Sequence, residues 1–237
     1  MGRRLVDTVC GTRRVVLSLP GGWSAAAGSW PAVLLQDGAE AAALFSGEEL
    51  EALFPGPRPP VLAFLYAGDR LAEYTPWPAA AMSSRFPDFP GRGGAYLMEL
   101  ERVCLPWLEA EWGVDRTRCS LLGYSIGGLI CTYALTVQTC WRSVASLCGS
   151  FWYEGWLAYL AAHPPLRRDA AVLLHHGTGE GTGKTTRMRD AAACAQETGA
   201  YLVRRLPGRV RLTWDKGGHH SFVKARYAAA LRWLAEG

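Results

Sequence analysis

The stretch RCSLLGYSIGGLICTYALTVQ, residues 118–138, decides the fold. Its first part, residues 118–123, is a short apolar run that ends at a glycine, which predicts a buried strand. Its last part, residues 126–138, is an apolar segment long enough for a helix. Between them stands Gly-Tyr-Ser-Ile-Gly, residues 123–127, with the serine at the turn. A G-x-S-x-G pentapeptide between a strand and a helix is typical of a nucleophile elbow.

The chemistry of this turn explains its residue types. A tight, strained turn leaves no room for side chains two residues before and two residues after the serine, and both positions are glycine. The turn lifts the hydroxyl of Ser125 above the sheet and places it at a helix N-terminus, where free N–H groups favour developing negative charge. We therefore predict that Ser125 is a nucleophile. The alternative is a glycine-rich turn that merely precedes a packed helix.

Further apolar runs alternate with helical segments on both sides of this stretch. The predicted strands cover residues 13–20, 32–38, 61–66, 118–123, 143–150, 170–176 and 209–214. The predicted helices cover residues 46–54, 95–113 (with a kink or early break at Pro106), 126–138, 185–198 and 222–236. This alternation predicts an α/β protein whose mostly parallel sheet is covered by helices on both faces. We expect one domain over residues 1–237, with the irregular segment 67–93 as a binding or lid loop.

Composition narrows the class of protein. A chain of 237 residues that is 49% hydrophobic suits one globular domain. The net charge is +4 and the arginines are scattered, so nothing supports nucleic-acid binding. The sequence contains no run of 18 apolar residues, so we expect no membrane span. The N-terminus does not resemble a signal peptide. The seven cysteines form no C-x-x-C pair, which favours buried free thiols in the cytoplasm and no metal or other cofactor.

A nucleophilic serine needs a base, and histidine suits this role because its pKa lies near neutrality. His219 and His220 lie in DKGGHHSF, a glycine-rich loop between the last predicted strand and the last helix. A late loop of this kind holds the base when the chain order is serine, acid, histidine. One of the two is therefore the predicted base. A capped helix start with surface histidines is the alternative.

The stretch GTGEGTGKTT, residues 177–186, looks at first like a phosphate-binding loop. The spacing G-x-x-x-x-G-K-[ST] would require glycine where Thr178 stands, so we do not expect nucleotide binding. The segment follows a predicted strand, and Glu180 is its only carboxylate. We predict Glu180 as the acid that orients the histidine. Asp190 and Asp215 are its rivals, the first within a predicted helix and the second at a strand end.

Two backbone N–H groups are expected to stabilise the oxyanion that forms during acyl transfer. One is that of Ile126, which follows the nucleophile. The other should come from an early loop after a strand, and LLQDG offers Gly38. An ordinary turn at residues 37–38 is an equal alternative.

Taken in order, several segments resemble the putative-esterase family of α/β-hydrolases, which includes esterase D-like enzymes and enterobactin-type siderophore esterases. The segments are LLQDG, RLAEYTPWP, LLGYSIGGL, SLCGSFWYEGW, HHGTGE and GGHHSF, and they span roughly residues 30–235. Gln36 and Glu73 depart from the family's commoner leucine and aspartate. The resemblance implies an α/β-hydrolase fold and hydrolysis of a carboxylic ester through an acyl-Ser125 intermediate. It also selects His220 as the base. Some relatives use a Ser–His pair and others are acyltransferases, so the acid and the acyl acceptor stay open.

The substrate is the least determined part of the prediction. Aromatic residues gather in the loop 67–93 and after the strand 143–150, and arginines lie in the same loop. We take Arg70 and Trp152 as substrate-binding residues for a bulky or aromatic ester, catecholate iron complexes included. The alternative is that the aromatics pack the loop against the body. A hydrolase-fold protein that binds a ligand without catalysis is the competing function.

Overall fold

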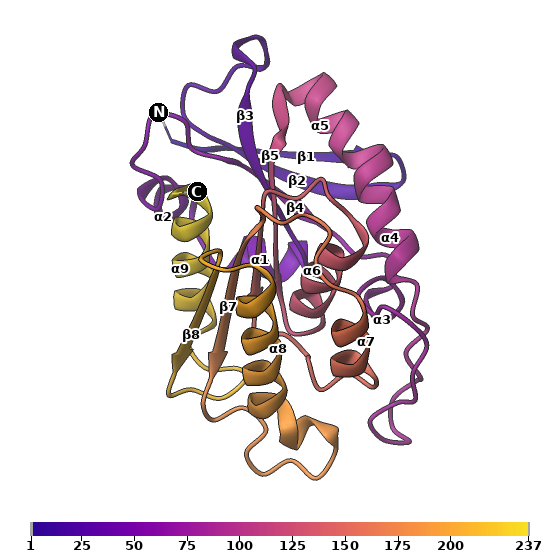
Figure 1. The fold of residues 1–237 in the computed structure, drawn as a ribbon. Helices are drawn as coiled ribbons and strands as arrows, with labels where there is room; N and C mark the ends of the chain where they lie inside the picture. Colours follow the sequence, from indigo (N-terminus) through magenta and orange to yellow (C-terminus); the bar gives the residue numbers. More distant parts are fainter. Residues whose placement is uncertain (1, 237) are drawn as a thin grey trace.

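The fold is built on one eight-stranded sheet with the order β1-β2-β4-β3-β5-β6-β7-β8. It is seen in a computed structural model that describes residues 2–236 (Figure 1). The strands are β1 (Arg4–Cys10), β2 (Arg13–Leu19), β3 (Trp30–Leu35), β4 (Val61–Leu65), β5 (Val114–Tyr124), β6 (Ser143–Leu147), β7 (Ala171–Gly177) and β8 (Val210–Asp215). Strands β4-β3-β5-β6-β7-β8 pair in parallel, whereas β2 pairs antiparallel with both β1 and β4. The predicted mostly parallel sheet and the α/β-hydrolase fold are confirmed.

Helices cover both faces of this sheet. They are α1 (Gly38–Ala43), α2 (Gly47–Ala52), α3 (Arg70–Glu73), α4 (Gly93–Glu99), α5 (Leu105–Trp112), α6 (Ile126–Val137), α7 (Trp156–Ala162), α8 (Ala191–Arg205) and α9 (Val223–Glu236). Helices α4 to α8 pack on one face, and α1, α2 and α9 pack on the other (Figure 1). The two-residue repeat of a strand sets this division, because Leu34 and Leu35 point into opposite core clusters. No helix within residues 2–236 is both long and apolar enough to cross a bilayer.

Two local expectations differ from the structure. Strand β1 was not predicted, because this edge strand, RLVDTVC, is mostly exposed and alternates with charged residues. Pro106 does not end its helix early. The chain stays helical from α4 through a π-helical turn at Leu100–Cys104 into α5, where Pro106 lies in the first turn. The π-helical turn lies directly before Pro106, where the missing proline N–H interrupts the regular series of helix hydrogen bonds.

The loop of residues 67–93 is fastened to the body by its aromatic residues. The indole Nε1 of Trp77 donates to the Glu154 carbonyl at 2.9 Å, and the Tyr153 hydroxyl donates to the Trp77 carbonyl at 2.5 Å. Phe89 is buried and lies edge-on to the Tyr153 ring at 5.3 Å between centroids. These contacts agree with the alternative given above, in which the aromatic residues pack the loop against the body of the protein instead of binding a ligand.

The parallel strands bring their carboxyl ends to one edge of the sheet. The segments that leave this edge are those after β3, β4, β5, β6, β7 and β8. Each of these segments carries at least one residue that the sequence analysis predicted for the site. The topology therefore brings together loops that are far apart in sequence. This edge is where a site is expected.

The turn at the end of β5 depends on Gly123. A Cβ atom there would lie 2.2 Å from the Gly127 carbonyl oxygen, which is backbone that cannot move aside. We expect Gly123→Ala to destabilise the protein by about 3 kcal/mol or more, because the turn itself must open. Thermal and urea unfolding measure the loss.

Gly94→Ala is the matched control. Gly94 lies in α4, and its Cβ would meet only the Tyr133 hydroxyl at 4.0 Å. That variant should match the wild type or gain about 0.5–1 kcal/mol, since alanine is the better helix former. Equal stability of the two variants would contradict the steric role of Gly123.

Candidate active site

Ser125 occupies a strained turn between β5 and α6. Its backbone has φ 58° and ψ −122°, a conformation that few residues other than glycine adopt. Its N–H donates to the Leu147 carbonyl at 2.9 Å, and its own carbonyl accepts from Leu129 at 3.0 Å and from Ser150 at 3.0 Å. Bonds from β6, α6 and the loop after β6 thus hold the strained backbone, and the hydroxyl is left half-buried at the edge of the sheet.

The histidine beside Ser125 is His219, and this corrects the prediction of His220. The Nε2 atom of His219 lies 3.1 Å from the Ser125 hydroxyl oxygen. Its Nδ1 atom lies 3.1 Å from Glu180 Oε2. His220 is exposed and its ring lies edge-on to that of His219. Spacing alone had left both residues open, and the family resemblance selected the wrong one.

Bonds to the backbone of the histidine loop decide which residue faces the serine. The hydroxyl of Tyr124, the residue before the nucleophile, donates to the carbonyl of His219. The guanidinium of Arg226, on α9, donates to the Gly218 carbonyl at 3.1 Å and to the Tyr124 hydroxyl at 2.7 Å. These anchors fix the chain at residues 218–219 and turn the His219 ring inward.

Asp215, a rival for the acid role, is committed elsewhere. Its carboxylate forms a two-point ion pair with Arg226, at 2.7 and 2.8 Å. The hydrogen bond from Arg226 holds the pKa of Asp215 well below its usual range. The Nε2 atom of His175 also lies 3.0 Å from this carboxylate. Asp215 therefore supports the histidine loop through Arg226 and does not contact His219.

Glu180 is the carboxylate that faces the histidine. It is 5% exposed, and its other oxygen, Oε1, accepts from the Gly177 N–H at 3.2 Å. Burial by itself would raise its pKa, but hydrogen bonds from His219 and the Cys148 thiol outweigh burial and lower the pKa of Glu180 to about 2. Glu180 is therefore an anion at neutral pH, able to hold a proton on Nδ1 of His219.

Two glycines of residues 177–186, Gly177 and Gly179, allow this loop to pack closely against the histidine loop. A Cβ at Gly177 would lie 2.1 Å from the Gly217 carbonyl oxygen, and the Gly179 N–H donates to that carbonyl at 3.0 Å. The N–H of Thr178 donates to the Asp215 carbonyl at 2.8 Å. These N–H groups are directed at the neighbouring histidine loop and form no open cradle for phosphate. Asp190, the remaining rival, precedes α8 and is exposed.

Three side chains of the kinds that can bind a metal ion lie close together in the site. Atoms of Cys148, Glu180 and His219 lie within 4.8 Å of one another. Burial raises the pKa of the Cys148 thiol, so it keeps its proton and can donate to Glu180. Mutual hydrogen bonding accounts for this cluster without an ion.

The expected oxyanion donors lie at the starts of two helices. Ile126 is the first residue of α6 and Gly38 the first of α1, where N–H groups have no partner within the helix. A Cβ at Gly127 would lie 3.1 Å from the Gln36 Cβ, so the two helix starts adjoin. Only glycine fits at position 38, because a Cβ there would lie 2.8 Å from the backbone of Leu65 at the end of β4.

A cavity of about 310 Å³ opens beside Ser125. Its lining residues are Asp37, Glu40, Leu44, Arg70, Tyr124, Ser125, His219, His220, Val223 and Tyr227. Arg70, predicted to bind substrate, lines this cavity, and its guanidinium is paired with Asp37 at 2.6 and 2.8 Å. Trp152 is half-buried against the core cluster under α4 to α8, which places it in the packing of the body.

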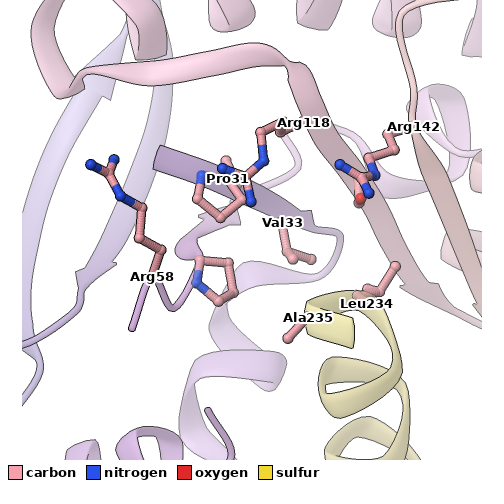
Figure 2. A pocket seen from close by; sticks show the side chains of 10 residues that line it. Pro31, Val33, Arg58, Arg118, Arg142, Leu234 and Ala235 are labelled. Atoms are coloured by element: carbon pink, nitrogen blue, oxygen red, sulfur yellow. The ribbon is translucent and has the colours of Figure 1, made fainter. Parts of the chain in front are cut away.

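A second, much smaller cavity of about 40 Å³ lies at the opposite edge of the sheet. It is lined by the start of β3, by Arg118 and Arg142, and by the end of α9 (Figure 2). Figure 2 shows the Arg58 side chain extending away from Pro31 and Leu234. None of the residues predicted for the site lines this cavity.

Comparisons with known proteins agree with this geometry. Residues 8–230 match the family model described as "Putative esterase". The chain belongs to this family. It is a carboxylic ester hydrolase, and the family resemblance drawn from its motifs is confirmed.

Individual relatives cover nearly the whole chain. "Uncharacterized protein YbbA" of Bacillus subtilis (strain 168) is 34% identical over 241 residues, which cover 97% of this chain and 95% of that protein. The IroE-like serine hydrolase from Shewanella oneidensis superposes with a TM-score of 0.78 at 18% identity, over 99% of this chain and 79% of the other. Siderophore hydrolase EstA from Aspergillus nidulans superposes with a TM-score of 0.73 at 18% identity, over 99% and 93%. These structural likenesses establish the fold.

Several residues of the esterase site had no predicted role. Tyr124 lies within the quoted elbow, and Ser150, whose hydroxyl lies 3.3 Å from that of Ser125, lies in the run SLCGSFWYEGW. Neither showed a signal beyond its place at the end of a predicted strand, Tyr124 just after residues 118–123 and Ser150 as the last residue of 143–150. Arg226 had the appearance of an exposed charge on an amphipathic helix, yet it is 2% exposed.

His176 is a buried histidine next to the acid. Neither ring nitrogen has a hydrogen-bond partner among the described residues, and Nδ1 lies 3.8 Å from Glu180 Oε1. Its ring lies between those of Phe151 and Trp214, at 5.4 and 5.5 Å between centroids. Burial lowers the pKa of His176 to about 4, so the ring is neutral at neutral pH.

This burial predicts a loss of stability in acid. The pKa of His176 is about 4 in the folded esterase against a usual 6.5, so the unfolded chain binds the extra proton between these values. Stability attributable to His176 is therefore intact above pH 6.5 and falls as the pH drops toward 4, by about 3 kcal/mol at most. His176→Phe should remove this part of the pH dependence. Urea unfolding from pH 7.5 to 4 measures it.

His163→Phe is the matched control, because His163 is exposed at the end of α7. It should leave the pH dependence as in the wild type. Parallel stability curves for wild type and His176→Phe across this range would contradict the assignment.

Proposed function

We propose that the protein is a serine esterase in which Ser125, His219 and Glu180 form the catalytic triad. The observation that carries the proposal is the unbroken chain of contacts from the Ser125 hydroxyl to His219 Nε2 and from His219 Nδ1 to Glu180, each at 3.1 Å. A nucleophile, a base and an orienting carboxylate in this order are what acyl transfer requires.

In the first half of the reaction the Ser125 oxygen attacks the ester carbonyl and His219 Nε2 takes the hydroxyl proton. The carbonyl electron pair moves onto the oxygen, where the N–H groups of Ile126 and Gly38 are the proposed donors. When the tetrahedral intermediate collapses, the bond to the alcohol oxygen breaks and His219 returns the proton to that oxygen. The acyl group remains on Ser125.

In the second half, water attacks the acyl group and gives a proton to His219. The bond to the Ser125 oxygen then breaks, and His219 protonates that oxygen, which restores the serine. Throughout, the Glu180 carboxylate stabilises the imidazolium and keeps Nδ1 protonated. Its lowered pKa, about 2, means that it stays charged over the whole range in which a histidine base works.

The cavity indicates an ester of small to medium size. Its volume of about 310 Å³ is at the low end for ligand pockets, and stacked Tyr124 and Tyr227 form an apolar wall. An acyl or alcohol part with a planar or aromatic group suits that wall. The fold-level likeness to proteins named siderophore hydrolases makes siderophore-type esters the first class to screen. We place the enzyme in the cytoplasm on the strength of its free cysteines.

Three single substitutions test the triad. Ser125→Ala and His219→Ala should each lower kcat by about 1,000-fold or more, because the nucleophile and the base act as one unit. His220→Ala is the matched control, since it changes the cavity wall alone and should alter KM more than kcat. Steady-state hydrolysis of p-nitrophenyl acetate and butyrate, with the fold verified by thermal unfolding, measures all three.

Two results would contradict the proposal. One is a Ser125→Ala variant that keeps more than about a tenth of wild-type turnover. The other is an inactive His220→Ala beside an active His219→Ala.

A further inference from the structure

The Ser125 oxygen has a second hydroxyl beside it. The Oγ atom of Ser150 lies 3.3 Å away, on the side supplied by the loop after β6. Ser150 is 0% exposed, so bulk solvent does not reach its hydroxyl. A buried hydroxyl needs a partner, and Ser125 Oγ is the one the described residues give it.

The triad fixes the direction of this hydrogen bond. Glu180 is a carboxylate and accepts, so Nδ1 of His219 carries the proton. The neutral ring then has a lone pair on Nε2, which accepts the proton of the Ser125 hydroxyl. Since that proton is already used, Ser150 must be the donor between the two serines. The order of donation is Ser150 to Ser125 to His219 to Glu180.

The backbone holds Ser150 in place for this contact. Its N–H donates to the Ser125 carbonyl at 3.0 Å, and its carbonyl accepts from the Tyr153 N–H at 3.0 Å. The preceding Gly149 is confined as well, because a Cβ there would lie 2.7 Å from Cζ of the buried Phe151 ring. The backbone of Ser150 is thus fixed in place, and one of its hydrogen bonds goes directly to the backbone of Ser125.

We propose that Ser150 is a further catalytic residue that donates a hydrogen bond to the Ser125 oxygen while that oxygen carries negative charge. The inference rests on the proposed triad. Charge builds on Ser125 Oγ as His219 removes its proton, and again when the bond from that oxygen to the acyl carbon breaks. Ser150 keeps its own proton in both steps, so the proton balance of the triad is unchanged.

The length of the contact fits this role. At 3.3 Å the bond is longer than the usual 2.7–2.8 Å between hydroxyls. Catalytic hydrogen bonds are often long in an empty site and shorten as the reaction proceeds. A bond that is weak to neutral Ser125 and strong to its charged form favours the transition state over the ground state.

Ser150→Ala tests the proposal. We expect kcat for p-nitrophenyl acetate to fall about tenfold with little change in KM, since a bond made mainly in the transition state is lost. Rapid-mixing kinetics should show both the burst of p-nitrophenol and the later steady rate slowed, because Ser125 Oγ gains charge in each half-reaction. The acid limb of the pH–rate profile should not move, whereas a displaced His219 would shift it. Ser150→Cys, which keeps a weak donor, should recover part of the loss.

Ser146→Ala is the matched control. Ser146 lies in β6, is equally buried, and its hydroxyl has no partner among the described residues. It should keep wild-type kinetics. Ser150→Ala rates within twofold of those of Ser146→Ala, or a Ser150→Cys variant no faster than Ser150→Ala, would overturn the role of Ser150.

Ser125→Ala in the same series separates the two levels of inference. If wild type and Ser146→Ala are active and Ser125→Ala is not, an unchanged Ser150→Ala overturns the role of Ser150 alone. If Ser125→Ala is as active as the wild type, the triad itself is wrong, and the role of Ser150 fails with it.

Discussion

The contact between Gly123 and Gly127 is the constraint on which the site depends. A Cβ atom at the first would lie 2.2 Å from the carbonyl oxygen of the second, so the chain can turn this sharply only with glycine there. The turn forces Ser125 into a strained backbone conformation at φ 58°, and bonds from β6 and α6 hold it. Strain kept in this way fixes the hydroxyl before any substrate arrives, so the geometry of attack costs nothing further at the moment of reaction.

Charge around the turn is arranged in two layers. The inner one joins Ser125, His219 and Glu180, whose pKa of about 2 keeps the carboxylate ionised. The outer one joins Asp215 and Arg226, an ion pair at 2.7 Å whose guanidinium also bonds the carbonyl of Gly218. Arg226 is 2% exposed, so removing Asp215 would leave a buried guanidinium without its counter-ion, which usually costs several kcal/mol. The outer pair bonds the histidine loop, so under the proposed triad its effect on catalysis would come through the position of that loop.

What the sequence could reveal depended on how local each signal was. The elbow and the strands around it were predictable, because glycine spacing and apolar runs are read within a few residues. The choice of His219 over His220 was not, since it is made by the Tyr124 hydroxyl, 95 residues away, and by Arg226. The loop of residues 177–186 was predicted to supply the acid, Glu180. The reason for Gly177 and Gly179 could not be predicted, because it lies in their contacts with Gly217 of the histidine loop. Edge strand β1 was not predicted, because exposed charged residues interrupt its apolar pattern.

The most direct test is the mass of the intact protein after treatment with a fluorophosphonate, followed by peptide mapping. Such a reagent phosphonylates an activated serine and needs no knowledge of the natural ester. The triad predicts a single adduct on Ser125, absent from Ser125→Ala and strongly slowed in His219→Ala. A folded protein that gains no adduct, or one that is labelled at another residue, would contradict a serine esterase built on Ser125 and favour a hydrolase fold that binds its ligand without catalysis.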